Sequence, residues 1–215
     1  MGTVAAVQAR GNAAKTCVAS VKAAFEELEG LLNAHDAQAE ICRLASLSEA
    51  EILATCDESV RTCYEQAFAL RRQTGGAFNP RWRGADTLDL GAIAKGYAVD
   101  VAAARLSPTN DTLIDLGGNL KAVKGDWTVG VKDGATFVLS EGEACATSAR
   151  YYRGDHIKDG RTGADAASGV YSVTVVHPTS AMLADGLSTV LFILGREKGE
   201  AFVKKNYPET KVFWL

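Results

Sequence analysis

Apolar residues recur three or four positions apart in three long segments of the chain, a spacing that places them on one face of an α-helix. These segments are Ala13–Asn33, Asp57–Arg72 and Ser180–Leu194. The third is apolar on nearly all sides, so we expect that helix to be buried. Ser48 and Glu51 have the spacing of a capping box and predict a further, short helix that begins there.

Short runs of β-forming residues, separated by turn residues, dominate the second half of the chain. Two more helices are predicted near Ile93–Leu106 and Glu197–Lys205. Helices gathered early and strands gathered late indicate an α+β fold rather than a regular alternation of the two. We therefore expect a mostly antiparallel sheet with the N-terminal helices packed on it and a buried C-terminal helix, in a single domain over residues 1–215. The predicted strands are Thr3–Ala9, Leu88–Leu90, Thr112–Leu116, Trp127–Val131, Thr136–Leu139, Ala144–Ser148, Val170–Val176 and Lys211–Leu215.

The composition is that of an ordinary globular protein, since 47% of the 215 residues are hydrophobic and 23% are charged. The net charge is −3 and no long basic run occurs, which does not favour nucleic acid as a partner. No apolar stretch reaches the roughly 18–20 residues that span a bilayer, so we expect no membrane span in this chain. The first residues show no basic segment followed by an apolar core. We expect either a cytoplasmic protein or one exported by an upstream signal that has been removed.

An acidic residue, Asp185, lies inside the most apolar helix. A buried carboxylate without a partner is costly, so this side chain should be paired or should bind a ligand. Thr189 follows four residues later and lies on the same helix face. A carboxylate and a hydroxyl are hard oxygen ligands that suit Mg²⁺. The alternative is a structural role, in which a neighbouring amide or arginine satisfies the carboxylate.

The segment Asp89–Asp100 predicts a strand that runs into a helix through Gly91 and Ala92. Free backbone N–H groups at a helix start bind anions, and small residues allow a diphosphate to approach closely. Lys95, expected in the first helical turn, would add a positive charge for phosphate, and Asp89 could accept hydrogen bonds from a nucleotide. The alternative is a junction whose small residues serve only tight packing.

A polar cluster lies at Asp155–Gly163 and combines an imidazole, two carboxylates and a guanidinium. His156 is the best candidate for a general acid or base among the three histidines, because only it lies in such a cluster. In the structural alternative, Asp159 and Arg161 only brace the turn. The segment Gly76–Pro80 follows a helix end and offers an aromatic ring and an amide to a ligand, or serves only the loop.

Taken in order along the chain, these segments resemble the FAD:protein FMN transferases, the ApbE-type flavin transferases. The likeness extends over nearly the whole chain and begins at Met1-Gly2-Thr3. No single match is specific, but the ordered set is. The strongest matches are Asp89–Asp100, Leu116–Asn119, Ala146–Ser148, His156–Gly163 and Val173–Thr189.

The resemblance implies a protein that handles flavin nucleotides and uses FAD and Mg²⁺. It places the metal ligands at the Ala92 carbonyl, Asp185 and Thr189, with Ser188 at a position where some members carry a carboxylate. His156 corresponds to the family's functionally important histidine. The positions that correspond to FAD contacts are Met1, Ala77, Phe78, Asn79, Asp89, Lys95 and Ile157.

The reaction that the resemblance implies cleaves FAD at its diphosphate and joins FMN to a threonine hydroxyl of an acceptor protein through a phosphoester. Mg²⁺ and Lys95 would neutralise the diphosphate, and His156 would accept or orient the threonine proton. Two alternatives stay open. One is an FAD pyrophosphatase that uses water and releases FMN and AMP, and the other is a protein that binds FAD without turnover.

Overall fold

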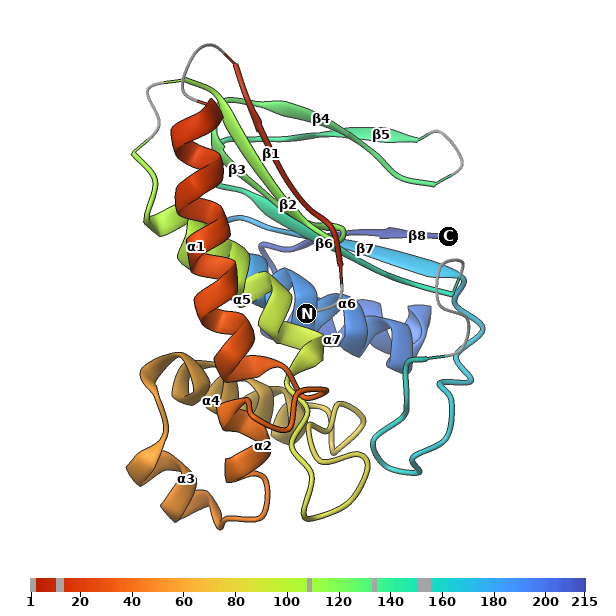
Figure 1. The fold of residues 1–215 in the computed structure, drawn as a ribbon. Helices are drawn as coiled ribbons and strands as arrows, with labels where there is room; N and C mark the ends of the chain where they lie inside the picture. Colours follow the sequence, from red (N-terminus) through yellow and green to blue (C-terminus); the bar gives the residue numbers. More distant parts are fainter. Residues whose placement is uncertain (1–2, 11–13, 108–109, 133–134, 151–155) are drawn as a thin grey trace.

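A computed structural model of the chain describes residues 3–10, 14–107, 110–132, 135–150 and 156–215 (Figure 1). At its centre lies a six-stranded sheet in the order β1-β2-β3-β6-β7-β8, in which all neighbouring strands are antiparallel. A separate hairpin of two strands, β4 and β5, lies over part of the sheet. The strands are β1 Ala5–Ala9, β2 Thr112–Leu116, β3 Asn119–Lys124, β4 Trp127–Gly130, β5 Thr136–Leu139, β6 Ala144–Ala149, β7 Ser172–His177 and β8 Lys211–Trp214.

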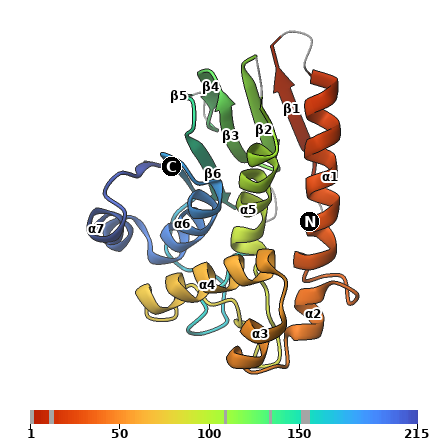
Figure 2. The ribbon, with the colours of Figure 1, turned by 90° about the vertical axis from the view of Figure 1, so that its left-hand side faces the viewer.

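The helices lie on one side of the sheet and beyond one of its ends (Figures 1 and 2). α1, α5 and α6 pack against the sheet, whereas α2, α3 and α4 form a group beyond its end, with α4 against α5 and α6. This arrangement confirms the predicted α+β class with a mostly antiparallel sheet. The helices are α1 Ala14–Leu32, α2 Glu40–Leu44, α3 Glu49–Thr55, α4 Glu58–Gln73, α5 Gly91–Ala104, α6 Ala181–Leu194 and α7 Arg196–Asn206.

The buried positions follow from the two layers that cover the sheet. Every residue of β7 is buried, because α6 packs on one face and the hairpin β4–β5 contributes a small second core on the other. That second core holds Leu113, Ala122, Trp127, Leu139, Cys145 and Val176. α6 is buried along most of its length, as its apolar sequence predicts. Among the described residues, no helix is both long enough and apolar enough to cross a membrane.

α5 and α6 cross at very short range, and this crossing creates the site. A Cβ atom on Gly96 would lie 2.1 Å from the backbone oxygen of Ala181, so only glycine fits there. One turn further along α5, the Asp100 carboxylate accepts hydrogen bonds from the backbone N–H groups of Ala181 and Met182, each at 3.0 Å. A carboxylate at a helix N-terminus is favourable. The start of α6 is thereby fixed on α5, which brings Lys95 beside the Asp185 side chain.

The sequence prediction was wrong for Leu88–Leu90, which is not a strand. Leu88 and Leu90 are apolar because both side chains are buried in the core, and the segment leads into α5, which begins at Gly91. Gly91 and Ala92 are therefore helical residues rather than turn residues. The sequence analysis also missed the short helix α2 and the strand β3, whose two lysines weaken its hydrophobic pattern.

Candidate active site

A cavity of about 1060 Å³ opens where the N-terminal half of α5, the middle of α6 and the sheet meet. Its wall includes Ala92, Lys95, Asp185, Thr189 and Asp89, which come from segments about 90 residues apart in the sequence. Small-molecule sites commonly measure roughly 300–1,000 Å³. The cavity is therefore large enough for a ligand of dinucleotide size.

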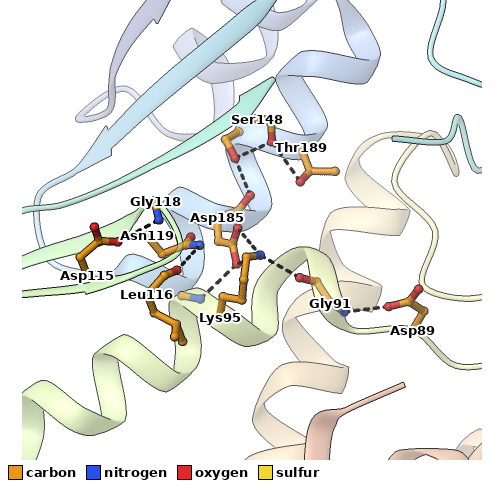
Figure 3. Close-up of polar contacts among 12 residues, drawn as sticks. Asp89, Gly91, Lys95, Asp115, Leu116, Gly118, Asn119, Ser148, Asp185 and Thr189 are labelled. Atoms are coloured by element: carbon orange, nitrogen blue, oxygen red, sulfur yellow. Dashed lines mark hydrogen bonds and ion pairs between the residues drawn. The ribbon is translucent and has the colours of Figure 1, made fainter. Parts of the chain in front are cut away.

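Lys95 and Asp185 form the central ion pair of this wall (Figure 3). The ammonium nitrogen of Lys95 lies 3.2 Å from both carboxylate oxygens, and the backbone N–H of Gly96 donates to Oδ2 at 3.0 Å. Only 5% of Asp185 is exposed. Burial raises the pKa of Asp185 above its ordinary value, and the nearby ammonium of Lys95 opposes that shift. The carboxylate thus has structural partners, as the alternative interpretation required, but both charged groups still face the cavity.

The hydrogen bond from the Gly96 N–H to Asp185 affects how strongly the Ala92 carbonyl is hydrogen-bonded within α5. In a regular α-helix, the N–H of residue 96 donates to the carbonyl of residue 92. Here the Asp185 carboxylate also takes that hydrogen, which leaves the Ala92 carbonyl with spare acceptor capacity. Ala92, Asp185 and Thr189 together offer a carbonyl, a carboxylate and a hydroxyl at one wall, a donor set that fits a hard divalent cation. The Lys95 ammonium already contacts this carboxylate, so a bound cation would share Asp185 with Lys95.

Ser188, the remaining predicted ligand, lies deeper than the others. It is fully buried and is not among the residues that line the cavity. Its hydroxyl donates to the backbone carbonyl of Asp185 at 2.9 Å and contacts the hydroxyl of Ser148 at 2.9 Å. Within the described part of the chain, no group of three His, Cys, Asp or Glu residues could hold a metal ion. The candidate cation site therefore depends on a single carboxylate.

Asp89 caps the start of α5. Its Oδ1 accepts the backbone N–H of Gly91 at 2.9 Å, and its Oδ2 lies 3.4 Å from a guanidinium nitrogen of Arg83. The first N–H group of the helix is therefore occupied by a carboxylate rather than free for an anion. Because α5 begins at Gly91, Lys95 lies in its second turn and not in the first, which corrects the sequence prediction. The positive charges that line the cavity near this helix start belong to Lys95 and Arg83.

The two predicted loops meet at the edge of the same cavity. The backbone N–H of Gly160 donates to the Ala77 carbonyl at 2.8 Å, and the Asn79 side-chain amide donates to the Gly160 carbonyl at 3.3 Å. These bonds bring Phe78 and Asn79 together with His156 at the cavity wall. Ala77 itself is buried behind the wall.

His156 and Ile157 both line the cavity, and the His156 side chain is exposed there. Asp159 and Arg161 form the ion pair that the structural alternative proposed for this turn. The Arg161 guanidinium holds the pKa of Asp159 below its ordinary value. Met1 and Asp155 lie outside the described residues.

The sequence analysis assigned no chemical role to two polar residues of the site. Ser148, at the end of β6, contacts both Ser188 and Thr189. Asn119, the first residue of β3, is 3% exposed and lines the cavity, and its Oδ1 has no hydrogen-bond partner among the described residues. A buried acceptor of this kind favours a ligand that brings a hydrogen-bond donor. Both residues lie in segments that the family resemblance covers, but single polar residues in short strands gave no signal of their own.

Comparisons with known proteins define the family. The chain belongs to the ApbE family, whose model matches residues 83–214. The matched range contains α5, α6 and β6, and therefore most of the cavity wall described above.

Curated relatives carry the name FAD:protein FMN transferase. The protein of Klebsiella pneumoniae is 36% identical over 143 residues, which cover 59% of this chain and 45% of that protein. The protein of Haemophilus influenzae is 32% identical over 142 residues, which cover 55% and 41%. The chain thus matches less than half the length of these relatives.

Solved structures share the complete fold. The flavin transferase ApbE from Vibrio cholerae superposes with a TM-score of 0.85 over 100% of this chain and 90% of that one, at 23% identity. The apo form of the flavinyl transferase ApbE from Pseudomonas stutzeri gives a TM-score of 0.79 over 99% and 90%, at 22% identity. At these identities the likeness concerns the fold.

Proposed function

We propose that this protein transfers FMN from FAD to a threonine hydroxyl of an acceptor protein, with the help of Mg²⁺. The observation that carries the proposal is the convergence of Asp185, Thr189, Ala92 and Lys95 on one wall of a dinucleotide-sized cavity. Family membership and the names of the curated relatives support the same reaction. The acceptor protein is a partner that the reaction requires.

The proposed cation ligands are the Asp185 carboxylate, the Thr189 hydroxyl and the Ala92 carbonyl. A bound Mg²⁺ would neutralise charge on the FAD diphosphate. Three protein oxygens are few, which is typical of Mg²⁺ sites completed by phosphate and water. Ser188 is not part of this set in our proposal, because its hydroxyl already donates to the Asp185 carbonyl.

The side chains of the cavity supply positioning and charge, which is most of what phosphoryl transfer requires. Lys95 would place its ammonium against the phosphate oxygens, since it lies at the wall beside Asp185. Phe78 and Ile157 would contact the apolar part of the flavin nucleotide, because both side chains line the same cavity.

The proposed chemical step is a displacement at the phosphorus atom of the FMN half. The acceptor threonine Oγ forms a bond to this phosphorus, and the bond from phosphorus to the bridging oxygen breaks. AMP leaves with the electron pair of that bond. An imidazole nitrogen of His156 takes the threonine proton, or orients it, a contribution of roughly 10²–10⁴-fold in rate.

The proposal is tested by incubating the protein with FAD, Mg²⁺ and a peptide that contains a threonine. Mass spectrometry should detect FMN attached to the peptide, and chromatography should detect one AMP for each modified peptide. A peptide with alanine in place of the threonine is the matched control and should remain unmodified. Free FMN plus AMP without modified peptide would favour the pyrophosphatase, and unchanged FAD would favour a protein that only binds it.

A further inference from the structure

Three hydroxyl groups lie in a row at the back of the cavity, and Figure 3 shows the dashed contacts that link Thr189 and Ser148 to Asp185. The Thr189 and Ser148 hydroxyl oxygens are 3.4 Å apart, and those of Ser148 and Ser188 are 2.9 Å apart. The Ser188 hydroxyl then lies 2.9 Å from the Asp185 backbone carbonyl. Each hydroxyl has one hydrogen to donate, so the direction of the whole row follows from the direction of any one bond.

The Asp185 carbonyl fixes this direction, because a carbonyl oxygen can only accept. Ser188 therefore donates its hydrogen to the carbonyl and can only accept from Ser148. Ser148 has then used its own hydrogen and can only accept from Thr189. The Thr189 hydrogen consequently points at Ser148, and the other side of Thr189 Oγ1, which carries lone-pair density, is left for the cavity that Thr189 lines.

We infer that Ser148 and Ser188 are positioning residues that hold the Thr189 hydroxyl as an oxygen ligand for a divalent cation. The inference rests on the proposed function, because it takes the cation site from there. A cation is attracted by the lone pairs of a hydroxyl and repelled by its hydrogen. Removing hydrogen bonds that orient a metal ligand typically weakens metal affinity 10–100-fold. Ser188 thereby acts through Thr189 and does not touch the metal, whereas the family resemblance places Ser188 among the metal ligands.

The row predicts the effects of two substitutions. In Ser148→Ala, the Thr189 hydroxyl loses the acceptor that holds its hydrogen, and cation affinity should fall roughly 10-fold. In Ser188→Ala, the Ser148 hydrogen becomes free to turn toward Thr189, which would rotate the Thr189 hydrogen toward the cavity. Cation affinity should again fall, although Ser188 does not line the cavity.

The matched control is Thr147→Val. Thr147 is the neighbour of Ser148 on β6, and its hydroxyl pairs with Thr174 at 2.8 Å instead of joining the row. This nearly isosteric substitution removes one hydroxyl from the same strand. It should leave the affinity for the cation unchanged.

The experiment is a titration of Mn²⁺ into each protein in the presence of FAD and without acceptor, followed by electron paramagnetic resonance of the free ion. Mn²⁺ takes the same oxygen ligands as Mg²⁺, and a blank with FAD alone corrects for binding to the nucleotide. Both serine substitutions are also made in a Thr189→Val protein. There they should have no further effect, because the ligand that they orient is absent.

Three results would overturn the inference. If the wild-type protein binds no Mn²⁺, the cation site of the proposed function is wrong, and the serines then have no metal ligand to orient. Wild-type binding together with unchanged affinity in Ser148→Ala and Ser188→Ala would leave the cation site intact and remove only the positioning role. A loss of affinity that persists in full in the Thr189→Val background would show that the serines act on the fold. Circular dichroism of each variant checks folding. If one serine variant does not fold, the other is sufficient for the test.

Discussion

At the scale of single residues, Asp185 has two roles that compete. Its carboxylate satisfies Lys95 and Gly96, and the same oxygens are the proposed ligands for a cation. A buried carboxylate that serves only structure could be replaced by an amide that keeps the hydrogen bond from Gly96. A metal ligand at this site could not be replaced in that way, because an amide would remove the only negative charge of the proposed ligand set.

Asp185→Asn and Asp185→Ala should therefore abolish Mg²⁺-dependent turnover of FAD while the fold survives. Asp185→Asn keeps an acceptor for the Gly96 N–H, so this variant is the one expected to disturb the fold least. Turnover is measured as AMP release, and folding by circular dichroism and thermal unfolding. Turnover that stays unchanged in a folded variant would remove Asp185 from the metal site.

His156→Ala tests the proposed proton acceptor. The side chain lies at the cavity wall but is exposed, so its removal should cost little FAD binding. Transfer to the threonine peptide should slow by roughly 10²–10⁴-fold. The measurements are single-turnover kinetics and a fluorescence titration of FAD. The reverse pattern, in which binding weakens more than transfer slows, would assign His156 to substrate binding.

At the scale of elements, the close crossing of α5 and α6 positions the site. Gly96→Ala would place a methyl group 2.1 Å from the Ala181 backbone oxygen, and neither backbone can move without shifting a helix. The free energy of unfolding should fall by about 1–3 kcal/mol or more, and FAD binding should weaken with it. Chemical denaturation measures the change in stability.

Gly30→Ala is the control for this prediction. Gly30 is also a helical glycine, but a Cβ atom there meets nothing within 4 Å. Alanine should therefore stabilise α1, by up to about 1 kcal/mol. Equal effects of the two substitutions would contradict the special role of the crossing.

We also expect the stability of the protein to depend on pH, because His177 binds the backbone just before α6. His177 is 5% exposed, and its Nδ1 accepts hydrogen bonds from the backbone N–H groups of Thr179 and Ser180. A protonated imidazole could not accept them. Burial lowers the pKa of His177 below 6.5, although Glu209 opposes this shift. The folded state therefore binds the proton more weakly than the unfolded state does.

The His177 contribution to the free energy of unfolding should be complete above about pH 6.5 and should decline as the pH falls from there toward the lower pKa of the folded state. His177→Asn keeps an acceptor oxygen and does not titrate. The difference between the wild-type and variant stability curves, measured by urea unfolding between pH 5 and 8, isolates the histidine. A difference that does not change with pH would contradict this role.

Several elements were predictable because local chemistry decides them. The Ser48–Glu51 capping box opens α3 with both of its hydrogen bonds in place, and the apolar pattern of Ser180–Leu194 predicted a buried helix that begins after Ser180. The strand prediction for Leu88–Leu90 was wrong because apolar residues that pack in the core just before a helix have the same sequence pattern as a short strand. The weakly patterned β3 could be found only through its pairing with β2 and β6.

At the scale of the whole molecule, the sequence indicated candidate residues for the site but not how they meet. Asp185 and Thr189 were found because a carboxylate is unusual in an apolar helix, and the structure places both at the same wall as Lys95 and Ala92. The position of Lys95 against Asp185 depends on the crossing of two helices that are 90 residues apart, which no local pattern encodes. The contact of Ser148 with Thr189 joins a strand to a helix for the same reason.

The arrangement of the layers gives the cavity two different sides. α5 and α6 supply the Lys95–Asp185 ion pair, and the loops that carry Phe78 and Ile157 add apolar side chains to the lining. A ligand with one charged diphosphate and one flat apolar ring system matches both sides. This combination supports FAD, rather than a simple phosphate, as the ligand in the proposed function.

The central claim is that the junction of α5 and α6 holds a divalent cation against the diphosphate of FAD. A crystal structure of the protein with FAD and Mn²⁺ tests it most directly, because anomalous scattering locates the metal without bias. The expected peak lies among the Asp185 carboxylate, the Thr189 hydroxyl and the Ala92 carbonyl, at about 2.0–2.3 Å from each oxygen. Bound FAD with no metal at this position, or with its diphosphate elsewhere, would contradict the claim.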